Sequence, residues 1–378
     1  MTRQQFWSGF LVMVVSVRAV CASSPFAPLG DLPGAQFQSQ AFGVSNDGSV
    51  VVGYGVSGVH TEAFAWDSAG GMVGMGDLPG GGVNLNSEAN GVSPDGQVIV
   101  GRGESDIGGE AFRWTSSTGF VGLGDLPGGG TGSVAFAISA NDVIVGYGSG
   151  TNGIEAMRWT QADGMLPLGD LDTGDFTSYA RSVSADGLVI AGLGTRSTGS
   201  EGFVWTSGGG MVGLGDLPGG QTESDARDIS ADGTVIVGFS RGTNGVEAFR
   251  WTAGGGMMGL GDLPGGEFYS QAFAVSGDGS IIVGDSASAS GNEAFIWDTV
   301  HGMRSLKQLL SQRGADLTGW QLSPTSISDD GRFVVGYGLN PAGDLEAWRA
   351  DLSVPEPAAV LLAAMAAIVL SAGRKRQA

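Results

Sequence analysis

Short apolar runs recur along this chain, each between a polar turn and a glycine, as in "SNDGSVVVG" and "SPDGQVIVG". The phrase begins at Ser45, Ser93, Ser184, Ser230, Ser276 and Ser328, and a version one residue shorter, "SANDVIVG", begins at Ser139. Consecutive apolar residues are typical of an inner strand that is covered on both faces. The Asp-Gly or Asn-Asp pair before each run predicts a two-residue hairpin turn, because these residues tolerate positive φ angles.

A second phrase, Glu-Ala-Phe-x-Trp, has the alternation of a strand, with large side chains on one face and small ones on the other. This pattern predicts closely stacked sheets. The phrase begins at Glu62, Glu110, Glu155, Glu201, Glu247 and Glu293, and a shortened "EAW" begins at Glu346.

A third phrase, "GLGDLPGG" and its near copies, predicts a further short strand that ends in a Pro-Gly turn. Its aspartates are Asp31, Asp77, Asp125, Asp170, Asp216 and Asp262, at intervals of 45 to 48 residues. Four strands in about 46 residues are typical of one blade of a β-propeller.

The repeat is incomplete at both ends, and the two ends are complementary. The "GDLPG" segment at 29–34 precedes every other phrase, whereas the last repeat has nothing like it after "EAW". We therefore expect an amino-terminal strand to complete the last blade and close the ring. A degenerate "GMRSLKQLL" from Gly302 supplies the fourth strand of the sixth blade, and 305–314 has the pattern of a helix. The prediction is an all-β, seven-bladed propeller over residues 23–353, with an open β-solenoid as the alternative.

The composition limits the structural class. Glycine accounts for 70 of the 378 residues, with 42% hydrophobic and 15% charged residues. Such a chain is too apolar for disorder and too rich in glycine for helical bundles. It favours a turn-dense all-β protein.

The amino end has the features of a secretory signal peptide over residues 1–22, with an apolar core at 10–17 and cleavage between Ala22 and Ser23. Cys21 is the only cysteine in the sequence. Cleavage after Ala22 would leave no cysteine, so no disulfide is expected in the mature protein.

The carboxyl end, residues 354–378, has three parts in a fixed order. An uncharged stretch of 15 residues, 358–372, lies between a proline-rich motif and a basic end. The motif is Val354, Pro355, Glu356 and Pro357, and the basic end is Arg374, Lys375 and Arg376. The stretch is predicted to be a transmembrane helix with its basic end in the cytoplasm, although about 20 residues are the usual span.

This tail resembles the PEP-CTERM sorting signal of Gram-negative bacteria, and the repeats resemble the extracellular HAF repeat family. The resemblance implies an inner-membrane intermediate, cleavage by an exosortase near Pro-Glu-Pro, and release to the cell envelope or exterior. The resemblance of the repeats implies a location and an architecture for the protein. It implies no activity, because the family is mostly uncharacterised. A plain hydrophobic anchor with a proline spacer is the alternative for the tail.

The charge narrows the choice of partners. The net charge is −20, and residues 23–357 alone carry −25 because five of the basic residues lie in the terminal segments. Nucleic acids and anionic membrane surfaces are disfavoured partners, since both require a cationic footprint. Divalent cations and neutral or cationic polymers remain possible binding partners.

The candidate chemistry is restricted to carboxylates. Only His60 and His301 are present, so we expect neither a histidine metal site nor a catalytic histidine, and no catalytic, metal or cofactor-binding residue is assigned. The repeated glutamates are interpreted as structural acceptors of hydrogen bonds, with a ring of functional acids as the alternative. The Ser-x-Asp-Gly turns are interpreted as hairpin turns, with Ca²⁺ binding as the alternative.

Any function must then lie where the repeats differ. The variable loops at 54–61 and 103–109, and the segments "GVNLNSEAN" and "EFYSQ" after "GDLPG", are the candidates. We expect an exported, non-catalytic binding scaffold for an extracellular polysaccharide or a matrix protein. The alternatives are a carbohydrate-active hydrolase or lyase with an asymmetric carboxylate pair, and a purely structural envelope protein.

Overall fold

The computed structural model describes residues 24–34, 36–58, 60–81, 86–171 and 176–354. The predicted signal peptide, the cleavage site and nearly all of the sorting segment lie outside these ranges. Within them, no helix combines the length and the apolar character that crossing a membrane requires.

The described chain is built from four-stranded antiparallel units. The first contains β2 (Ser39–Val44), β3 (Val50–Ser57), β4 (His60–Asp67) and β5 (Gly71–Gly76). The second contains β6 (Glu88–Val92), β7 (Ile99–Ser105), β8 (Gly108–Thr115) and β9 (Gly119–Gly122). The third contains β10 (Ser133–Ile138), β11 (Ile144–Ser149), β12 (Gly153–Thr160) and β13 (Gly164–Gly169). The fourth contains β14 (Phe176–Val183), β15 (Val189–Arg196), β16 (Gly199–Thr206) and β17 (Gly210–Gly213).

The remaining units follow the same plan. The fifth contains β18 (Ser224–Ile229), β19 (Ile236–Arg241), β20 (Val246–Thr252) and β21 (Gly256–Gly259). The sixth contains β22 (Ser270–Val275), β23 (Ile281–Ser288), β24 (Gly291–Asp298) and β25 (Gly302–Ser305). The last contains β26 (Gln321–Ile327), β27 (Phe333–Leu339), β28 (Leu345–Asp351) and the amino-terminal β1 (Phe26–Gly30). A short parallel pairing of β12 with β14 joins the third and fourth units into one eight-stranded sheet.

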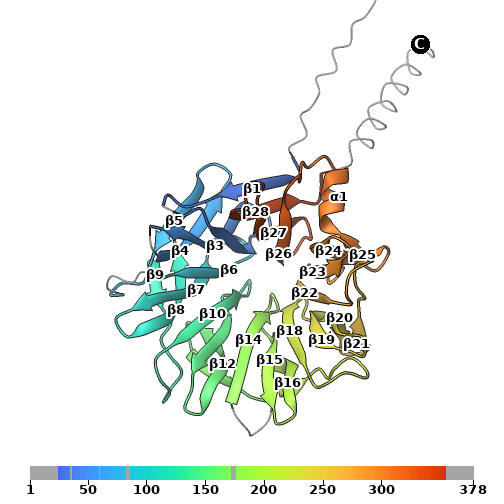
Figure 1. Cartoon of the computed structure of the whole chain (residues 1–378). Helices are drawn as coiled ribbons and strands as arrows, with labels where there is room; N and C mark the ends of the chain where they lie inside the picture. Colours follow the sequence, from blue (N-terminus) through green and yellow to red (C-terminus); the bar gives the residue numbers. More distant parts are fainter. Residues whose placement is uncertain (1–23, 35, 59, 82–85, 172–175, 355–378) are drawn as a thin grey trace, which may run out of the picture.

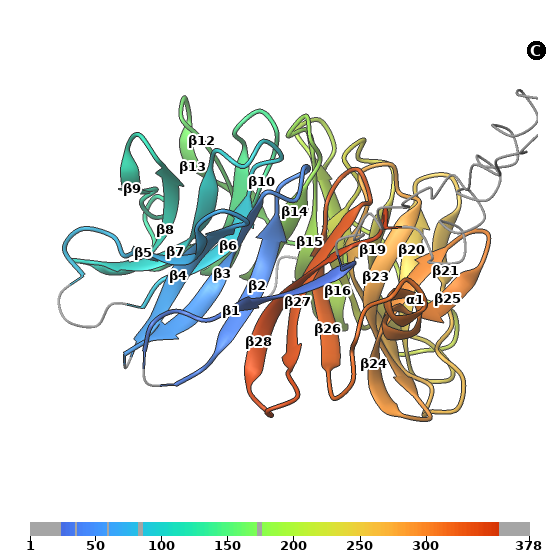
Figure 2. The same cartoon turned by 90° about the horizontal axis from the view of Figure 1, so that it is seen from above.

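The units stand around a common centre, with the first strand of each unit innermost (Figure 1). Viewed from above, they lie side by side as twisted sheets (Figure 2). The prediction of an all-β propeller is therefore confirmed.

The amino end of the described chain lies against its carboxyl end. Strand β1 pairs with β28, with Phe26 opposite Ala350 (Figure 2). The last unit also touches the first, since the Ala347 N–H donates to Ser39 Oγ at 3.0 Å and Thr325 Oγ1 donates to the Ala41 carbonyl at 2.7 Å. An open solenoid would hold these ends apart. The strand lies at 26–30 rather than at 29–34, because "GDLPG" forms the turn after it.

A bulge in every inner strand depends on the glycine that ends each apolar run. In the first unit the register shifts between Ala41 and Gly43, which makes Phe42 an extra residue in β2. Gly53 lies opposite, and a Cβ atom on it would come within 1.9 Å of the Gln40 carbonyl oxygen. A side chain at Gly53 would therefore exclude the bulge.

The same arrangement recurs in all seven units, with the imagined Cβ 1.9 to 2.1 Å from a carbonyl oxygen of the inner strand. The glycines are Gly53, Gly101, Gly146, Gly192, Gly238, Gly284 and Gly336. The extra residues of the bulges are Phe42, Asn90, Phe136, Arg181, Arg227, Phe273 and Thr325. All seven of these extra residues line the central channel.

The Glu-Ala-Phe-x-Trp strand packs on both neighbouring units, as the alternation predicts. Phe64 is fully buried in a cluster with Phe333 and Val335 of the last unit. Ala63 is fully buried against Ile99 and Phe112 of the second unit. Each strand of this kind thus contributes to two hydrophobic interfaces.

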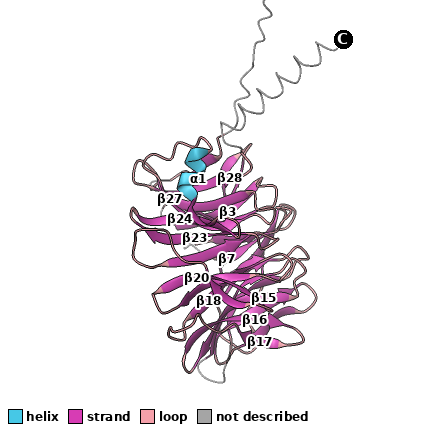
Figure 3. Ribbon diagram, turned by 90° about the vertical axis from the view of Figure 1, so that its right-hand side faces the viewer, coloured by secondary structure: helices cyan, strands magenta, loops and turns pink. Residues whose placement is uncertain are grey.

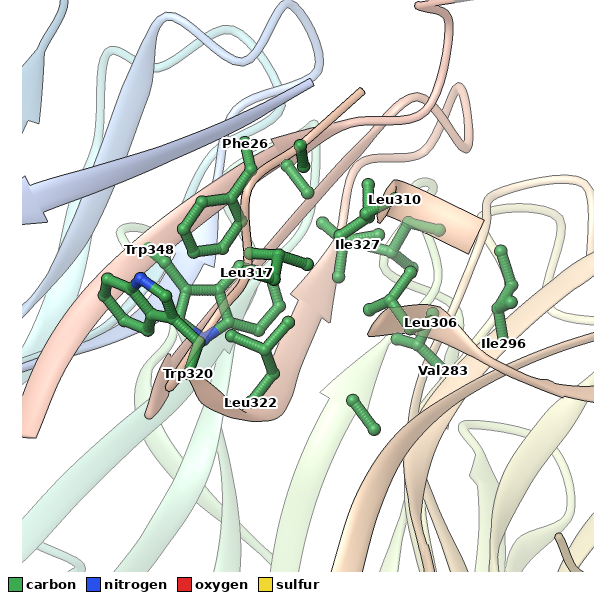
Figure 4. Close-up of a cluster of buried hydrophobic side chains, with 14 of the residues drawn as sticks. Phe26, Val283, Ile296, Leu306, Leu310, Leu317, Trp320, Leu322, Ile327 and Trp348 are labelled. Carbon is green, nitrogen blue, oxygen red and sulfur yellow. The ribbon is translucent and has the colours of Figure 1, made fainter. Parts of the chain in front are cut away.

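The last unit corrects one sequence interpretation. Its "EAW" is not shortened, because Trp348 lies opposite Gly336 as Phe64 lies opposite Gly53. Trp348 thus replaces the usual phenylalanine. Phe26 of the amino-terminal strand packs on it with ring centroids 5.8 Å apart, and Trp320 packs edge-on to Phe26 (Figure 4).

The Ser-x-Asp-Gly turns differ from the predicted two-residue hairpins. The connection from β2 to β3 has five residues, and among them only Gly48 has a positive φ, at 66°. Asp47 acts through its carboxylate, which accepts hydrogen bonds from Ser45 Oγ and the Ser49 N–H. In the short third repeat Asp142 takes the glycine's place with a φ of 68°.

The second residues of these turns hydrogen-bond to one another around the centre. Backbone N–H groups donate to the next turn's carbonyl at distances of 2.9 to 3.2 Å. The described pairs are Asn46 to Pro94, Ala140 to Ala185, Ala185 to Ala231, Ala231 to Gly277 and Gly277 to Asp329. The Asp329 N–H donates to Asn46 Oδ1 at 3.0 Å. Only Pro94, which has no N–H, interrupts this turn ring.

The predicted helix is confirmed as α1 (Leu306–Gln312), which Ser305 caps by accepting from the Gln308 N–H. It lies at the rim beside β24, where Leu306 and Leu310 are fully buried (Figure 3). The predicted fourth strand of the sixth unit is also present as β25.

Replacing a bulge glycine tests this account. Gly53→Ala is expected to lower the free energy of unfolding by about 3 kcal/mol or more, because a backbone carbonyl occupies the place of the methyl group. Gly208→Ala is the control, since a Cβ there meets no atom within 4 Å, and a change within about 0.5 kcal/mol is expected. Equal losses in urea denaturation would contradict the bulge argument.

Candidate functional site

The repeated glutamates bind the turn that follows the outer strand. In six units Oε1 accepts a hydrogen bond from a glycine N–H at 2.8 to 3.2 Å. The pairs are Glu62 with Gly76, Glu110 with Gly124, Glu155 with Gly169, Glu201 with Gly215, Glu247 with Gly261 and Glu346 with Gly30. Glu293 lies in the sixth unit, whose β25 is not followed by "GDLPG". The last pair shows β1 taking the place of an outer strand.

A buried serine, which the sequence analysis missed, joins each such turn to the next unit. Ser133 Oγ donates to the Gly124 carbonyl and accepts from the Ala111 N–H. The other five serines make the same two bonds, and all six are at most 1% exposed. They are Ser39, Ser87, Ser178, Ser224 and Ser270. The repeated glutamates and serines are thus engaged in hydrogen bonds within the scaffold.

The central channel is where the units differ. Its wide end, here called the mouth, has a volume of about 410 Å³, and the cavities below it have volumes of about 220 and 130 Å³ toward the turn ring. The seven extra residues of the bulges surround the mouth, together with Glu88, Ser323 and Tyr337. The volume of the mouth is that of a small-molecule pocket.

The walls of the mouth are chemically unequal. Phe42, Phe136 and Phe273 supply apolar faces, whereas the fourth and fifth units supply Arg181 and Arg227. The repeats have become asymmetric at this position, although the backbone geometry is the same. Such a mixture of aromatic walls and a few polar groups is typical of ligand sites.

The two arginines share one carboxylate. Arg181 makes two hydrogen bonds to Asp225, at 3.0 and 3.1 Å. Arg227 Nε lies 3.0 Å from Asp225 Oδ2 but makes no hydrogen bond to an acceptor of the described chain. Burial lowers the pKa of Arg227, Asp225 opposes this, and Arg181 lowers it further by repulsion.

Deeper in the channel, Asp228 is held by three donors. It accepts from Ser182 Oγ at 2.6 Å, the Val275 N–H at 2.8 Å and the Ile229 N–H at 2.9 Å. Burial raises its pKa to about 6 despite these bonds. Burial also raises the pKa of Asp329 at the turn ring.

All five tyrosines of the chain cluster around this mouth. The ring of Tyr54 lies 5.6 Å from that of Phe42, and Tyr147 lies 5.6 Å from Phe136 and 5.1 Å from Tyr179. Tyr337 lines the mouth directly. Burial raises the pKa of Tyr269, the charge of Asp285 raises it further, and the charge of Arg227 lowers it.

One sequence signal points to part of this cluster. Tyr54, Tyr147 and Tyr337 each follow the bulge glycine of their unit, and so does Asp285. Burial raises the pKa of Asp285 to about 6, while Ser323 Oγ donates to its carboxylate at 2.6 Å. Aligning the repeats on the glycine would therefore have marked this position.

The loops predicted to carry function contribute unequally to the mouth. Glu88 and Asn90, from "GVNLNSEAN", line it, and Tyr269, from "EFYSQ", lies near it. The segment 54–61, predicted to be a loop, lies mostly in β3 and β4, and its Tyr54 is a residue of β3 whose ring lies beside Phe42. His301 instead pairs with Asp298 in an outer turn at 2.9 Å. Among the described residues, no group of three or more His, Cys, Asp or Glu is placed to hold a metal ion.

Comparison with known proteins finds no matching family model and no matching curated protein. Solved structures give distant likenesses. TolB from Acinetobacter baumannii is 15% identical over 58% of this chain, which spans 52% of that protein's length, with a TM-score of 0.42. A gluconolactonase from Xanthomonas campestris is 11% identical over 86% of this chain and 88% of its own, with a TM-score of 0.42. An oligogalacturonate lyase from Vibrio parahaemolyticus is 12% identical over 84% of this chain and 97% of its own, with a TM-score of 0.38.

The titration of Asp228 predicts a pH dependence of stability. Unfolded aspartate has a pKa near 3.9, and the folded pKa is about 6, so the folded state holds this proton more tightly. Relative to Asp228→Asn, the wild-type free energy of unfolding should fall as the pH rises from about 4 to about 6 and then level off.

Denaturation at a series of pH values measures this difference. Asp232→Asn is the control with the opposite sign, because hydrogen bonds from Ser230 and Thr234 lower the pKa of Asp232. Its contribution to stability should be lost only as the pH falls below about 4. A flat difference curve for Asp228→Asn would show that its carboxyl does not titrate in this window.

Proposed function

We propose that the protein is an exported, non-catalytic binding scaffold that takes a chain of extracellular polysaccharide at the mouth of its channel. The observation that carries the proposal is the convergence of seven bulges on one place, with a different set of side chains around it. The repeated glutamates and serines are engaged in the scaffold, whereas the side chains at the mouth differ between units.

The chemistry of the mouth suits a sugar. Aromatic side chains present apolar faces to the C–H surface of a sugar ring, and Tyr337, Asn90 and Ser323 offer partners for its hydroxyl groups. A polymer end fits a cavity of about 410 Å³, whereas a folded protein surface does not. The strongly acidic body also disfavours nucleic acid.

One observation favours the second candidate, a carbohydrate-active hydrolase or lyase. Asp285 Oδ1 is buried with no hydrogen-bond partner in the described chain, and the pKa of the carboxyl is raised to about 6. A general acid needs a pKa near the working pH. Asp225 and Asp228 suit this role less well, because an arginine or three donors already engage them.

Export is part of the same proposal. The signal peptide 1–22 would direct the chain across the inner membrane, and an exosortase-type enzyme would cleave near Pro355-Glu356-Pro357. The mature protein would then reach the envelope or the exterior without the basic Arg374-Lys375-Arg376 end. These steps rest on the sequence and on the family resemblance.

A glycan array with the purified protein, run with and without calcium, tests the binding proposal. We expect binding to polysaccharide fragments, and we expect Phe42→Ala combined with Phe273→Ala to weaken it about tenfold or more through loss of the aromatic walls. Val300→Ala, at an 82% exposed outer turn, is the control and should bind normally. Silence across the array would favour a structural envelope protein instead.

Epitope tags at both ends of the chain test export and sorting. In cells that contain an exosortase, the mature protein should lack the amino-terminal tag and the tag after Ala378, and it should be recovered from the envelope or medium. Retention of the carboxyl-terminal tag on the mature protein would identify a plain hydrophobic anchor.

A further inference from the structure

The fourth and fifth units each place an arginine at the mouth. Two guanidinium groups, of Arg181 and Arg227, face the single carboxylate of Asp225. Asp225 is only 6% exposed at its side chain, whereas the arginines are 24% and 31% exposed and line the cavity. The arginines therefore remain accessible to a second anion after Asp225 is engaged.

In the described structure, the printed ion pairs of both arginines are with Asp225 and not with another carboxylate near the mouth. Asp228 is bound to Ser182 and to two backbone N–H groups, and no ion pair joins it to either arginine in the described structure. Glu88 lies on β6 of the second unit. Burial raises the pKa of Tyr54 and of Tyr147, and the negative charge of Glu88 raises both further. On β14 and β18, two guanidinium groups thus share the one carboxylate of Asp225, while Asp228 is held by other donors deeper in the channel.

The geometry of Arg227 shows where the unused capacity lies. Its Nε is buried and close to Asp225, yet makes no hydrogen bond, while Arg181 donates to the same carboxylate from Nε and Nη2. The side chain packs beneath the ring of Phe239, 5.3 Å from its centroid, which holds the guanidinium in place. A planar guanidinium held in this way is suited to a carboxylate.

We propose that the sugar bound at the mouth is a hexuronate, with its carboxylate on Arg227 and Arg181 and its hydroxyl groups on the opposite wall. This inference rests on the proposed function and names its ligand class. Glu88 is a hydroxyl acceptor on that wall, and Phe42 and Phe136 supply faces for the sugar ring. An acidic peptide would satisfy the arginines but would leave the aromatic walls and Glu88 without matched partners.

Calorimetric titration of the purified protein tests the ligand class. The probes are an oligoglucuronate, the same oligosaccharide after reduction of its carboxyl groups to alcohols, and an oligoglutamate peptide. We expect the oligoglucuronate to bind about tenfold or more tightly than its reduced form, although the body is acidic, because the two arginines give a local site for a carboxylate. Arg227→Gln should abolish the difference between the two sugars.

Two further variants keep the test decisive. Arg332→Gln, which removes an exposed pair with Asp351 at the turn face, should leave the preference intact. Arg227→Lys keeps the charge and should retain part of the preference even if Arg227→Gln folds poorly.

The outcomes separate the inference from the proposed function. Equal binding of both sugars, unchanged in Arg227→Gln, would overturn the hexuronate assignment while supporting a polysaccharide site. Binding of the peptide alone, lost in Arg227→Gln, would overturn the sugar class. Binding of none of the probes, together with silence on the glycan array, would overturn both.

Discussion

The fold depends on the close approach of a carbonyl oxygen to a glycine in every unit. At Gly53 and its six equivalents, the backbone of the inner strand occupies the place where any other residue would carry its Cβ atom. This contact permits a bulge, and the bulge turns one side chain per unit toward the centre. The composition of the channel therefore follows from a contact between main chains.

The residues that recur in every unit thus build the scaffold, whereas residues that differ between units line the mouth. Glutamate, serine and the turn aspartates recur because they satisfy backbone N–H and carbonyl groups that would otherwise be buried without partners. The extra residue of the bulge is less constrained. Asn90 and Thr325 donate to backbone carbonyls, whereas the same backbone position in the other units carries phenylalanine or arginine. Variation concentrated at one geometric position would let a symmetric ring hold an asymmetric ligand.

Much of this architecture is predictable from sequence, because the repeat is long and its phrases are regular. The strands, the outer turns, the helix after Ser305 and the pairing partner of the amino-terminal strand all follow from the order of the phrases. The turn type is not predictable from Asp-Gly alone, since Asp47 acts through its carboxylate rather than through its φ angle. "EAW" misleads for a related reason, because Trp348 fills the volume of the usual phenylalanine and only the register reveals it.

The mouth is harder to predict than the fold. Arg181 and Arg227 hold the same position in consecutive repeats, and only the bulge explains why both line one cavity. The position after each bulge glycine would have marked Tyr54, Tyr147, Tyr337 and Asp285, but their convergence needs the ring. Local patterns determine elements, whereas a site made of one residue from each unit is a property of the closed arrangement.

The pairing of β1 with β28 also decides how the molecule responds to tension. Because the two strands are antiparallel and Phe26 lies opposite Ala350, both ends of the described chain leave from the same end of the pair. A force that pulls these ends apart would load the backbone hydrogen bonds one after another, as in unzipping, rather than all together in shear. Mechanical opening would therefore begin at this seam and would undo the ring before any other sheet is strained.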